Sequence, residues 1–101
     1  METQFNSDNP RAVISIDGRF DFSRHREFRG ICDQTLGAAG VREVEVDFAR
    51  VSYIDSSALG MLLLLRDNAR LANKTVRLVN CRGSVRQILD IANFAKLFPI
   101  S

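Results

Sequence analysis

The stretch EVEVDFARVSYIDSSALGMLLLL, residues 43–65, carries the clearest structural pattern in this 101-residue chain. Over Glu43–Phe48, acidic and apolar side chains alternate, so the two valines and the phenylalanine point to one side of an extended strand. Further along, apolar residues recur at three- and four-residue steps, which is typical of an amphipathic helix. The stretch therefore predicts a half-covered strand that leads, through Asp55 or Ser56 as the helix cap, into a helix ending near Asn73.

A second strand and helix are predicted before this stretch. Ala12–Ile16 is apolar and rich in β-branched residues, and Asp17-Gly18 behind it is a turn signal, so we expect a short strand that ends there. Apolar side chains at helical spacing over Phe22–Leu36, followed by glycines, predict the helix.

The same alternation continues after residue 65. Thr75–Val79 predicts another strand, and Gly83-Ser84 opens a last helix. Its apolar spacing runs through Ala95 until Pro99 ends it.

Strands that alternate with helices call for parallel pairing with right-handed crossovers, so the fold class is α/β. Thr3-Gln4-Phe5 supplies a fourth, edge strand, although residues 1–10 could instead be a poorly ordered N-terminus. The length fits one domain over residues 1–101, a small and mostly parallel four-stranded sheet with helices packed alongside.

Composition and charge limit the classes of partner that we expect for this protein. Fourteen basic and twelve acidic side chains are interleaved, and the chain has no tryptophan, so nothing resembles a nucleic-acid footprint and we expect protein partners. Cys32 and Cys81 lack metal-ligand spacing, so we expect buried free thiols, no metal and no cofactor. The N-terminus lacks a secretory signal and the run Met61–Leu65 is too short to cross a bilayer, so we expect a cytoplasmic protein without membrane insertion.

Catalysis is poorly supported by the residue types present. His25 is the only histidine, no glycine-rich phosphate loop occurs, and no nucleophile elbow presents a serine. A hydrolase using Ser56 or Ser57 with His25 is a weak alternative. Glu43 and Glu45 alternate with valines, which is more typical of the solvent-facing side of a sheet than of a general acid/base pair. We therefore expect no enzyme activity.

The start of the second helix is the candidate site. A projection at 100° per residue separates a core face from a polar face on which two leucines fall. Either those leucines are ordinary surface residues or covered by a neighbouring segment, or they form a partner-binding stripe with a modifiable serine at its head. The projected core face contains Ala58, Met61, Leu62, Leu65, Ala69 and Ala72, and the stripe contains Ser56, Leu59, Leu63, Arg66 and Arg70.

Asp55-Ser56-Ser57-Ala58-Leu59-Gly60 resembles the signature of STAS domains, the anti-sigma factor antagonists, and Asp17-Gly18-Arg19-Phe20-Asp21 resembles the family's turn after the second strand. The resemblance covers nearly the whole chain and matches the family's order of elements. One departure is Ala58, where the best-known members carry glycine.

The resemblance implies a phosphorylation-controlled switch. The serine after the aspartate, Ser56 and less favourably Ser57, would be phosphorylated by a partner that is both anti-sigma factor and serine kinase, with a cognate phosphatase reversing the reaction. The unmodified protein would bind this partner and regulate transcription indirectly, as a monomer. The partner-binding residues implied are Asp21, Asp55, Ser56, Ser57, Leu59, Gly60 and Leu63. STAS domains also serve as accessory subunits of ABC-type lipid transporters, which is the alternative.

Overall fold

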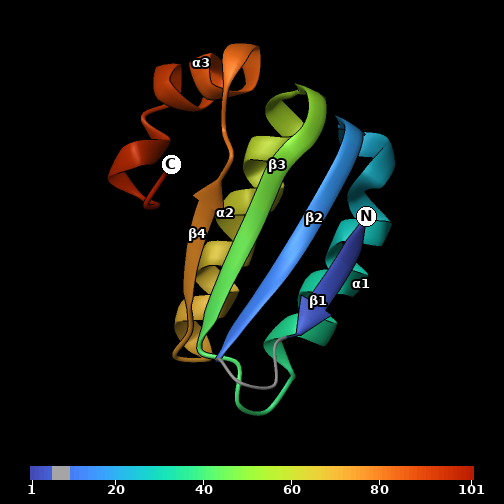
Figure 1. The fold of residues 1–101 in the computed structure, drawn as a ribbon, viewed down its shortest axis with the longest axis vertical. Coiled ribbons are helices and arrows are strands. Elements are labelled where there is room, and N and C mark those ends of the chain that lie inside the picture. Colours follow the sequence, from blue (N-terminus) through green and yellow to red (C-terminus); the bar gives the residue numbers. More distant parts are fainter. Residues whose placement is uncertain (6–9) are drawn as a thin grey trace.

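A four-stranded sheet with the order β1-β2-β3-β4 lies at the centre of the computed structural model, which describes residues 1–5 and 10–101 (Figure 1). The strands are β1 (Glu2–Phe5), β2 (Arg11–Phe20), β3 (Glu43–Ile54) and β4 (Thr75–Val79). β1 runs antiparallel to β2, and β2, β3 and β4 are parallel. The α/β class and the edge strand around Thr3 are confirmed, while residues 6–9 of the predicted N-terminal region lie outside the described residues.

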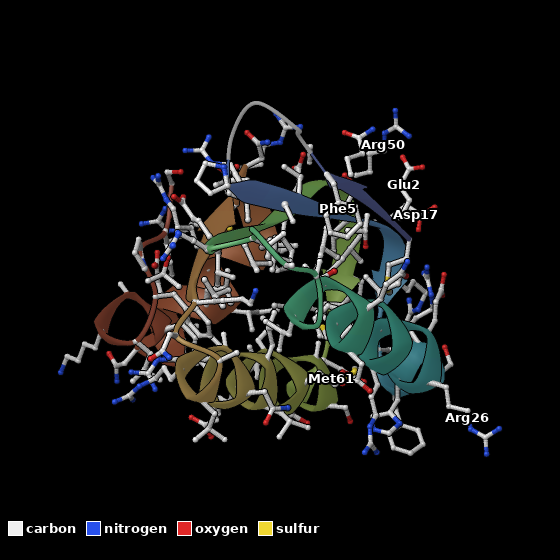
Figure 2. The ribbon with its side chains drawn as sticks, turned by 90° about the horizontal axis from the view of Figure 1, so that it is seen from below. Glu2, Phe5, Asp17, Arg26, Arg50 and Met61 are labelled. Carbon is white, nitrogen blue, oxygen red and sulfur yellow. The ribbon has the colours of Figure 1, made fainter. Side chains whose placement is uncertain are left out.

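Two helices cover one face of this sheet. α1 (His25–Leu36), preceded by a 3-10 turn over Phe22–Arg24, lies beside α2 (Ser56–Leu71) beneath the strands (Figures 1 and 2). α3 (Gly83–Ile91) lies beyond the end of β4, and a second 3-10 turn spans Phe94–Lys96. Among the described residues no helix lies on the opposite face of β2 and β3, which explains why the side chains of these strands alternate between apolar and polar.

The core lies between the sheet and the two helices. In β3, Val44, Val46 and Phe48 are buried as the alternation predicts, and the acidic residues between them are half-buried on the other face. Phe48 packs near Phe20 of β2, whose ring lies 4.9 Å from that of Phe28 in α1, measured between centroids. Aromatic contacts of this kind tie sheet and helix together.

The predicted turn at Asp17-Gly18 is wrong, because β2 continues through it to Phe20. The pairing of β2 with β3 shifts by one residue between Ser15 and Asp17 and again after Gly18, so two residues of β3 have no direct partner in β2. Gly18 has φ +65°, a conformation that favours glycine. The dipeptide therefore lies inside the sheet, opposite the place where β3 carries its two extra residues.

The bounds of α2 confirm one of the two predicted caps. The helix begins at Ser56, with Asp55 as its N-cap, and ends two residues before the predicted end. Of the predicted core face, all residues are buried except Ala72, which is exposed as the C-cap. Leu59 and Leu63 are half-buried and pack against the core, so the stripe is less exposed than the projection predicts.

The last helix is shorter than predicted. It ends at Ile91, and Asn93 takes the left-handed conformation with φ 59° that breaks the helical path. Phe94 and Phe98 then bury their rings, stacked 5.4 Å apart, while Ala95 is exposed. The apolar spacing that suggested one helix is thus shared between a helix and an irregular buried segment.

Candidate functional site at the carboxyl ends of two strands

Asp55 connects β3 to α2. Its backbone is extended, with φ −116° and ψ −178°, and its Oδ1 accepts a hydrogen bond of 2.9 Å from the backbone N–H of Ala58. The first four N–H groups of a helix have no partner within the helix, and an aspartate at the N-cap satisfies one of them. The remaining donors and the helix dipole leave a partial positive field at this end of α2.

Ser56 is the first residue of α2 and its side chain is exposed, whereas Ser57 is half-buried. An enzyme that modifies a hydroxyl needs access to it, so exposure favours Ser56. A negative group there would sit in the field of the helix start.

Asp21 reaches the same edge of the sheet from the neighbouring strand. Phe20 of β2 pairs with Ile54 of β3, so Asp21 and Asp55 are the next residues after two adjacent parallel strands. The carboxyl ends of parallel strands meet at one edge, which brings the two predicted acidic residues together.

The carboxylate of Asp21 is held in place by Ser23. Its Oδ1 accepts hydrogen bonds from both the hydroxyl and the backbone N–H of Ser23, the latter at 3.0 Å, which caps the 3-10 turn. The Ser23 hydroxyl is the main cause that keeps the pKa of Asp21 below its ordinary value. Asp21 is therefore a fixed negative charge at neutral pH.

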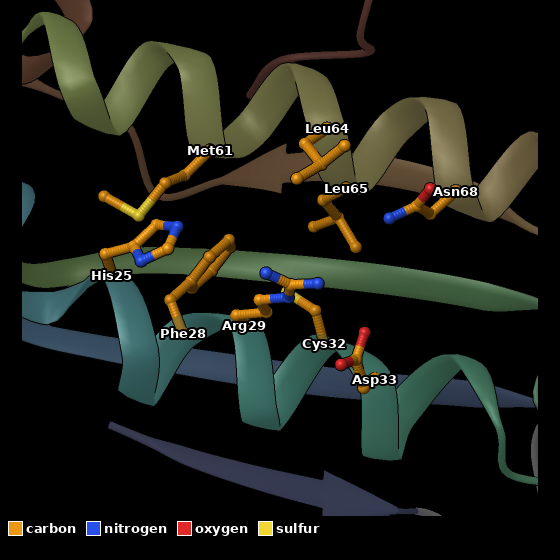
Figure 3. Close-up of a pocket in the computed structure, with 9 residues that line it drawn as sticks. All are labelled: His25, Phe28, Arg29, Cys32, Asp33, Met61, Leu64, Leu65 and Asn68. Carbon is orange, nitrogen blue, oxygen red and sulfur yellow. The ribbon is translucent and has the colours of Figure 1, made fainter.

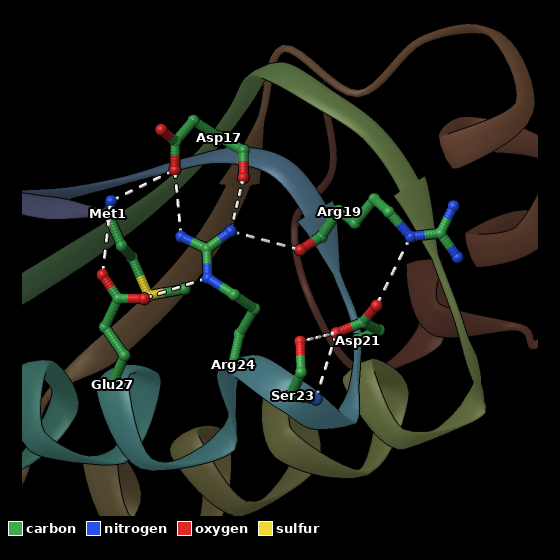
Figure 4. A network of polar contacts seen from close by, with 7 residues as sticks. All are labelled: Met1, Asp17, Arg19, Asp21, Ser23, Arg24 and Glu27. Atoms are coloured by element: carbon green, nitrogen blue, oxygen red, sulfur yellow. Dashed lines mark hydrogen bonds and ion pairs between the residues drawn. The ribbon is translucent and has the colours of Figure 1, made fainter.

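A cation beside this edge was not expected from the sequence. The guanidinium of Arg19 lies 4.2 Å from the centre of the Tyr53 ring. Its Nε is 3.4 Å from Oδ2 of Asp21, a contact drawn in Figure 4. Arg19 and Tyr53 are paired residues of β2 and β3, and the paired strands bring the two side chains together. A pattern of strand residues does not reveal such a pair unless the register across the two shifts is known.

A second polar network fixes the segment that follows. Arg24 donates to Asp17 and Glu27 carboxylates at 3.0 and 2.9 Å and to the backbone carbonyls of Asp17 and Arg19 at 2.9 and 3.2 Å (Figure 4). The hydrogen bond from Arg24 is the main cause that lowers the pKa of both carboxyl groups. These contacts join residues 17–19 of β2, where its register with β3 shifts, to the start of α1.

The remaining predicted contact residues lie on the first two turns of α2. Leu59 and Leu63 are half-buried, and Gly60 is exposed with no atom within 4 Å of the place where a Cβ would stand. The leucine most exposed in the middle of the helix is Leu64, at 50%, on the side that faces α1.

Leu64 borders a groove of about 250 Å³ between α1 and α2, which Met61, Phe28 and Cys32 also line (Figure 3). His25 lies at its rim, and its ring stacks on Phe22 with 5.9 Å between centroids. Burial raises the pKa of Cys32 to about 12 and that of Cys81 to about 11, so both thiols stay protonated at neutral pH, as buried free cysteines.

Within residues 1–5 and 10–101, no three histidine, cysteine or carboxylate side chains gather in a way that would hold a metal ion. Over the same residues, no helix is long and apolar enough to span a bilayer.

Comparison of the sequence with known proteins gives a family match over almost the whole chain. The family model described as "Mlab, STAS domain" matches residues 3–99. The STAS-domain containing protein PA14_20770 of Pseudomonas aeruginosa (strain UCBPP-PA14) is 47% identical over 96 residues, which cover 95% of this chain and 93% of that protein. The putative anti-sigma factor antagonist BtrV of Bordetella bronchiseptica is 31% identical over 62 residues, 61% of this chain and 53% of its own length.

Solved structures with the same fold include several anti-sigma factor antagonists. The putative antagonist tm1081 from Thermotoga maritima superposes with a TM-score of 0.85 at 15% identity, over 98% of this chain and 83% of that one. SpoIIAA in its unphosphorylated form gives 0.74 at 17% identity, over 99% and 86%. The phosphorylated form of Bacillus SpoIIAA gives 0.71 at 18% identity, over 99% and 91%.

Proposed function

Because the chain belongs to the STAS domain family, we propose that it is an anti-sigma factor antagonist that switches partners when Ser56 is phosphorylated. The unmodified protein binds a partner that is both anti-sigma factor and serine kinase, and phosphorylation of Ser56 releases that partner. A cognate serine phosphatase restores the binding form. The chain is then a kinase substrate rather than an enzyme, acts in the cytoplasm as a monomer, and influences transcription without touching DNA.

The observation that carries this proposal is the position of Ser56. It is an exposed hydroxyl on the first residue of α2, directly after the Asp55 cap and at the strand edge where Asp21 also lies. Structures of SpoIIAA, which has this fold, exist for a phosphorylated and an unphosphorylated form, which supports the same chemistry here.

A phosphate at Ser56 is tolerated by the fold. It adds about −1.5 to −2 charge at neutral pH, and the helix dipole favours such a charge by about 0.3 to 1 kcal/mol. Arg19 offers a nearby cation, since it belongs to the strand pair that ends at this edge.

The same phosphate disfavours a docked partner. Against an acidic or apolar surface, and next to Asp21 and Asp55, repulsion and desolvation of about 1 to 3 kcal/mol oppose binding. This corresponds to about one to two decades in affinity. Phosphorylation is therefore expected to change binding and leave folding intact.

The test is affinity capture from cells that make the protein, with wild type, Ser56→Ala and Ser56→Asp as baits, together with phosphosite mapping of the recovered chain. We expect phosphate on Ser56 and a serine kinase retained by wild type and Ser56→Ala but lost from Ser56→Asp. Ser84→Asp is the matched control, because Ser84 is also exposed in the first turn of a helix, α3.

Equal recovery of the kinase by all baits would contradict the switch. Recovery of an ATPase and a permease by every bait, with Ser56 unmodified, would instead establish the accessory subunit of a lipid transporter.

A further inference from the structure

A groove of about 460 Å³ lies between the C-terminal half of α2, strand β4 and the segment that follows α3. Arg66, Arg70, Lys74 and Arg77 line it with a single acidic residue, Glu43. Arg70 lies about 20 Å along the helix axis from Ser56, at about 1.5 Å per residue. The groove is thus separate from the proposed phosphorylation site.

The charges in this groove do not cancel. Oε1 of Glu43 lies 3.6 Å from Nη1 of Arg77 and 3.6 Å from Nε of Arg11, so its charge is already shared between two arginines. Arg66 Nε donates to the carbonyl of Leu97 at 2.9 Å, and its Nη1 lies 3.8 Å from Oδ1 of Asp67, an exposed carboxylate that compensates part of its charge. Arg70 is exposed and forms no ion pair with a residue in the described ranges. A negatively charged partner is favoured here.

Lys74 also lines the groove, and its ammonium is not neutralised by the groups to which it donates. Nζ donates to the carbonyls of Ala38 and Val41 at 3.1 and 2.6 Å, which are neutral acceptors. Its charge adds to the field while its position is fixed by the fold.

The edge of β4 supplies a second, independent observation. The N–H of Thr75 donates to the carbonyl of Arg42, next to β3. In a parallel ladder the main-chain groups of alternate residues point to the same neighbour, so those of Val76 and Leu78 point to the outer edge of β4, while their side chains are buried. The outer edge at Leu78 is occupied, because its N–H donates to Pro99 and its carbonyl accepts from Ser101. By the same alternation the main-chain N–H and C=O of Val76 also point away from β3, and no loop or terminal segment among the described residues forms a backbone hydrogen bond with them. Val76 lines the groove.

The chain itself demonstrates what this edge accepts. Residues 99–101 lie beside Leu78 as an extended segment in parallel orientation. The position next to it, at Val76, offers the same pair of main-chain groups with a basic wall on one side.

We propose that this groove binds an acidic, extended segment of a protein partner, which adds to β4 beside Val76 and places carboxylates against Arg70 and Arg77. Strand addition supplies affinity through main-chain hydrogen bonds, and the basic wall selects acidic side chains. A nucleic acid fits less well, because no aromatic side chain lines the groove on which a base could stack. This docking does not depend on the state of Ser56.

The test is a titration of the ¹⁵N-labelled full chain with a ten-residue peptide of alternating glutamate and threonine. We expect amide shifts at residues 74–78 and on the facing turn of α2, and slower hydrogen exchange of the Val76 N–H. Arg70→Glu should weaken binding about tenfold, because it replaces an attraction by a repulsion. The matched control is Arg26→Glu on the exposed side of α1, which should leave the affinity unchanged.

Three results would overturn the proposal. Equal shifts from a second peptide, of alternating lysine and threonine, would show that the groove does not select acidic side chains. Rapid hydrogen exchange of the Val76 N–H in the bound state would show that the peptide does not add to β4 as a strand. Tighter binding of a single-stranded deoxythymidine decamer at the same residues would assign the groove to nucleic acid. Ser56→Asp should bind the acidic peptide as wild type does, so failure here is distinct from failure of the switch.

Discussion

At the scale of single residues, Asp55 combines a structural and a proposed functional role. Its carboxylate caps α2 through the N–H of Ala58, and its backbone places Ser56 at the exposed start of the helix. A change at Asp55 therefore affects the presentation of Ser56 even where the serine is intact.

Replacing Asp55 by alanine should lower the free energy of unfolding by about 0.5 to 2 kcal/mol, because the N–H of Ala58 loses its side-chain acceptor at 2.9 Å and keeps only the main-chain carbonyl of residue 55 at 3.1 Å. Urea denaturation of the purified variants measures this change. Asp55→Ser should recover most of the loss, and Asp67→Ala, an exposed aspartate on the same helix, should change the free energy by no more than about 0.5 kcal/mol. A loss at Asp67 as large as that at Asp55 would mean that the cap is not the cause.

Asp17 provides a pH-dependent prediction. The hydrogen bond from Arg24 is the main cause that holds the pKa of Asp17 below 3.8, its ordinary value. Because the folded pKa is lower than the unfolded one, this contact stabilises the protein above the unfolded pKa, and the stabilisation disappears as the pH falls through the folded pKa.

Arg24→Gln should raise the pKa of Asp17 toward its ordinary value, and carboxyl ¹³C shifts followed during an acid titration measure it. Arg26→Gln serves as the control, because Arg26 is exposed and is not among the described residues that pair with Asp17, which are Arg24 and the N-terminal amine. An unchanged titration of Asp17 in Arg24→Gln would show that the N-terminal amine, 3.1 Å away, dominates.

At the scale of elements, α2 carries the largest difference between expectation and structure. Leu63 falls on the polar side of the projected helix but is half-buried against the core. Leu71, the last residue of α2, is 85% exposed.

Leu63→Glu should cost about 1 to 3 kcal/mol of unfolding free energy, since it places a carboxylate where an apolar side chain packs. Leu71→Glu should stay within about 0.5 kcal/mol of wild type. Thermal denaturation of both variants measures the contrast, and equal stability would return Leu63 to the surface.

Strands and helices were predictable from the sequence where the local alternation or spacing of apolar residues determines them. The strand Thr75–Val79 has the predicted bounds, and the alternation over residues 43–48 gives the correct buried face. The projection of α2 failed at Leu63, because a helical wheel does not include the tertiary packing that half-buries this side chain against the core. The site followed the same rule: Asp21, Asp55 and Ser56 were identified from motifs, but the Arg19 and Tyr53 contact depends on strand register.

At the scale of the whole molecule, the proposed phosphorylation site stands on an edge of the sheet that the strands and helices already fix. Ser56 is exposed and outside the core, so its modification should not be transmitted through packing.

Ser56→Asp should therefore unfold with a free energy within about 1 kcal/mol of wild type, with the helix dipole favouring the new charge. Differential scanning calorimetry measures the effect, with Ser84→Asp as the matched substitution at the start of α3. A large loss confined to Ser56→Asp would indicate that phosphorylation acts by unfolding.

The two register shifts between β2 and β3 have a consequence for how this chain tolerates insertions and deletions. Each shift adds one residue to β3 and so changes which of its alternate side chains point to the core. Because there are two shifts, the original alternation is restored at the end of the strand, where Phe20 and Ile54 are paired and buried. Losing one residue between Phe48 and Tyr53 would turn Ile54 outward and direct Asp55 and Ser56 to the wrong side of the sheet. Losing two would preserve the parity, so length variation in this strand should occur in steps of two.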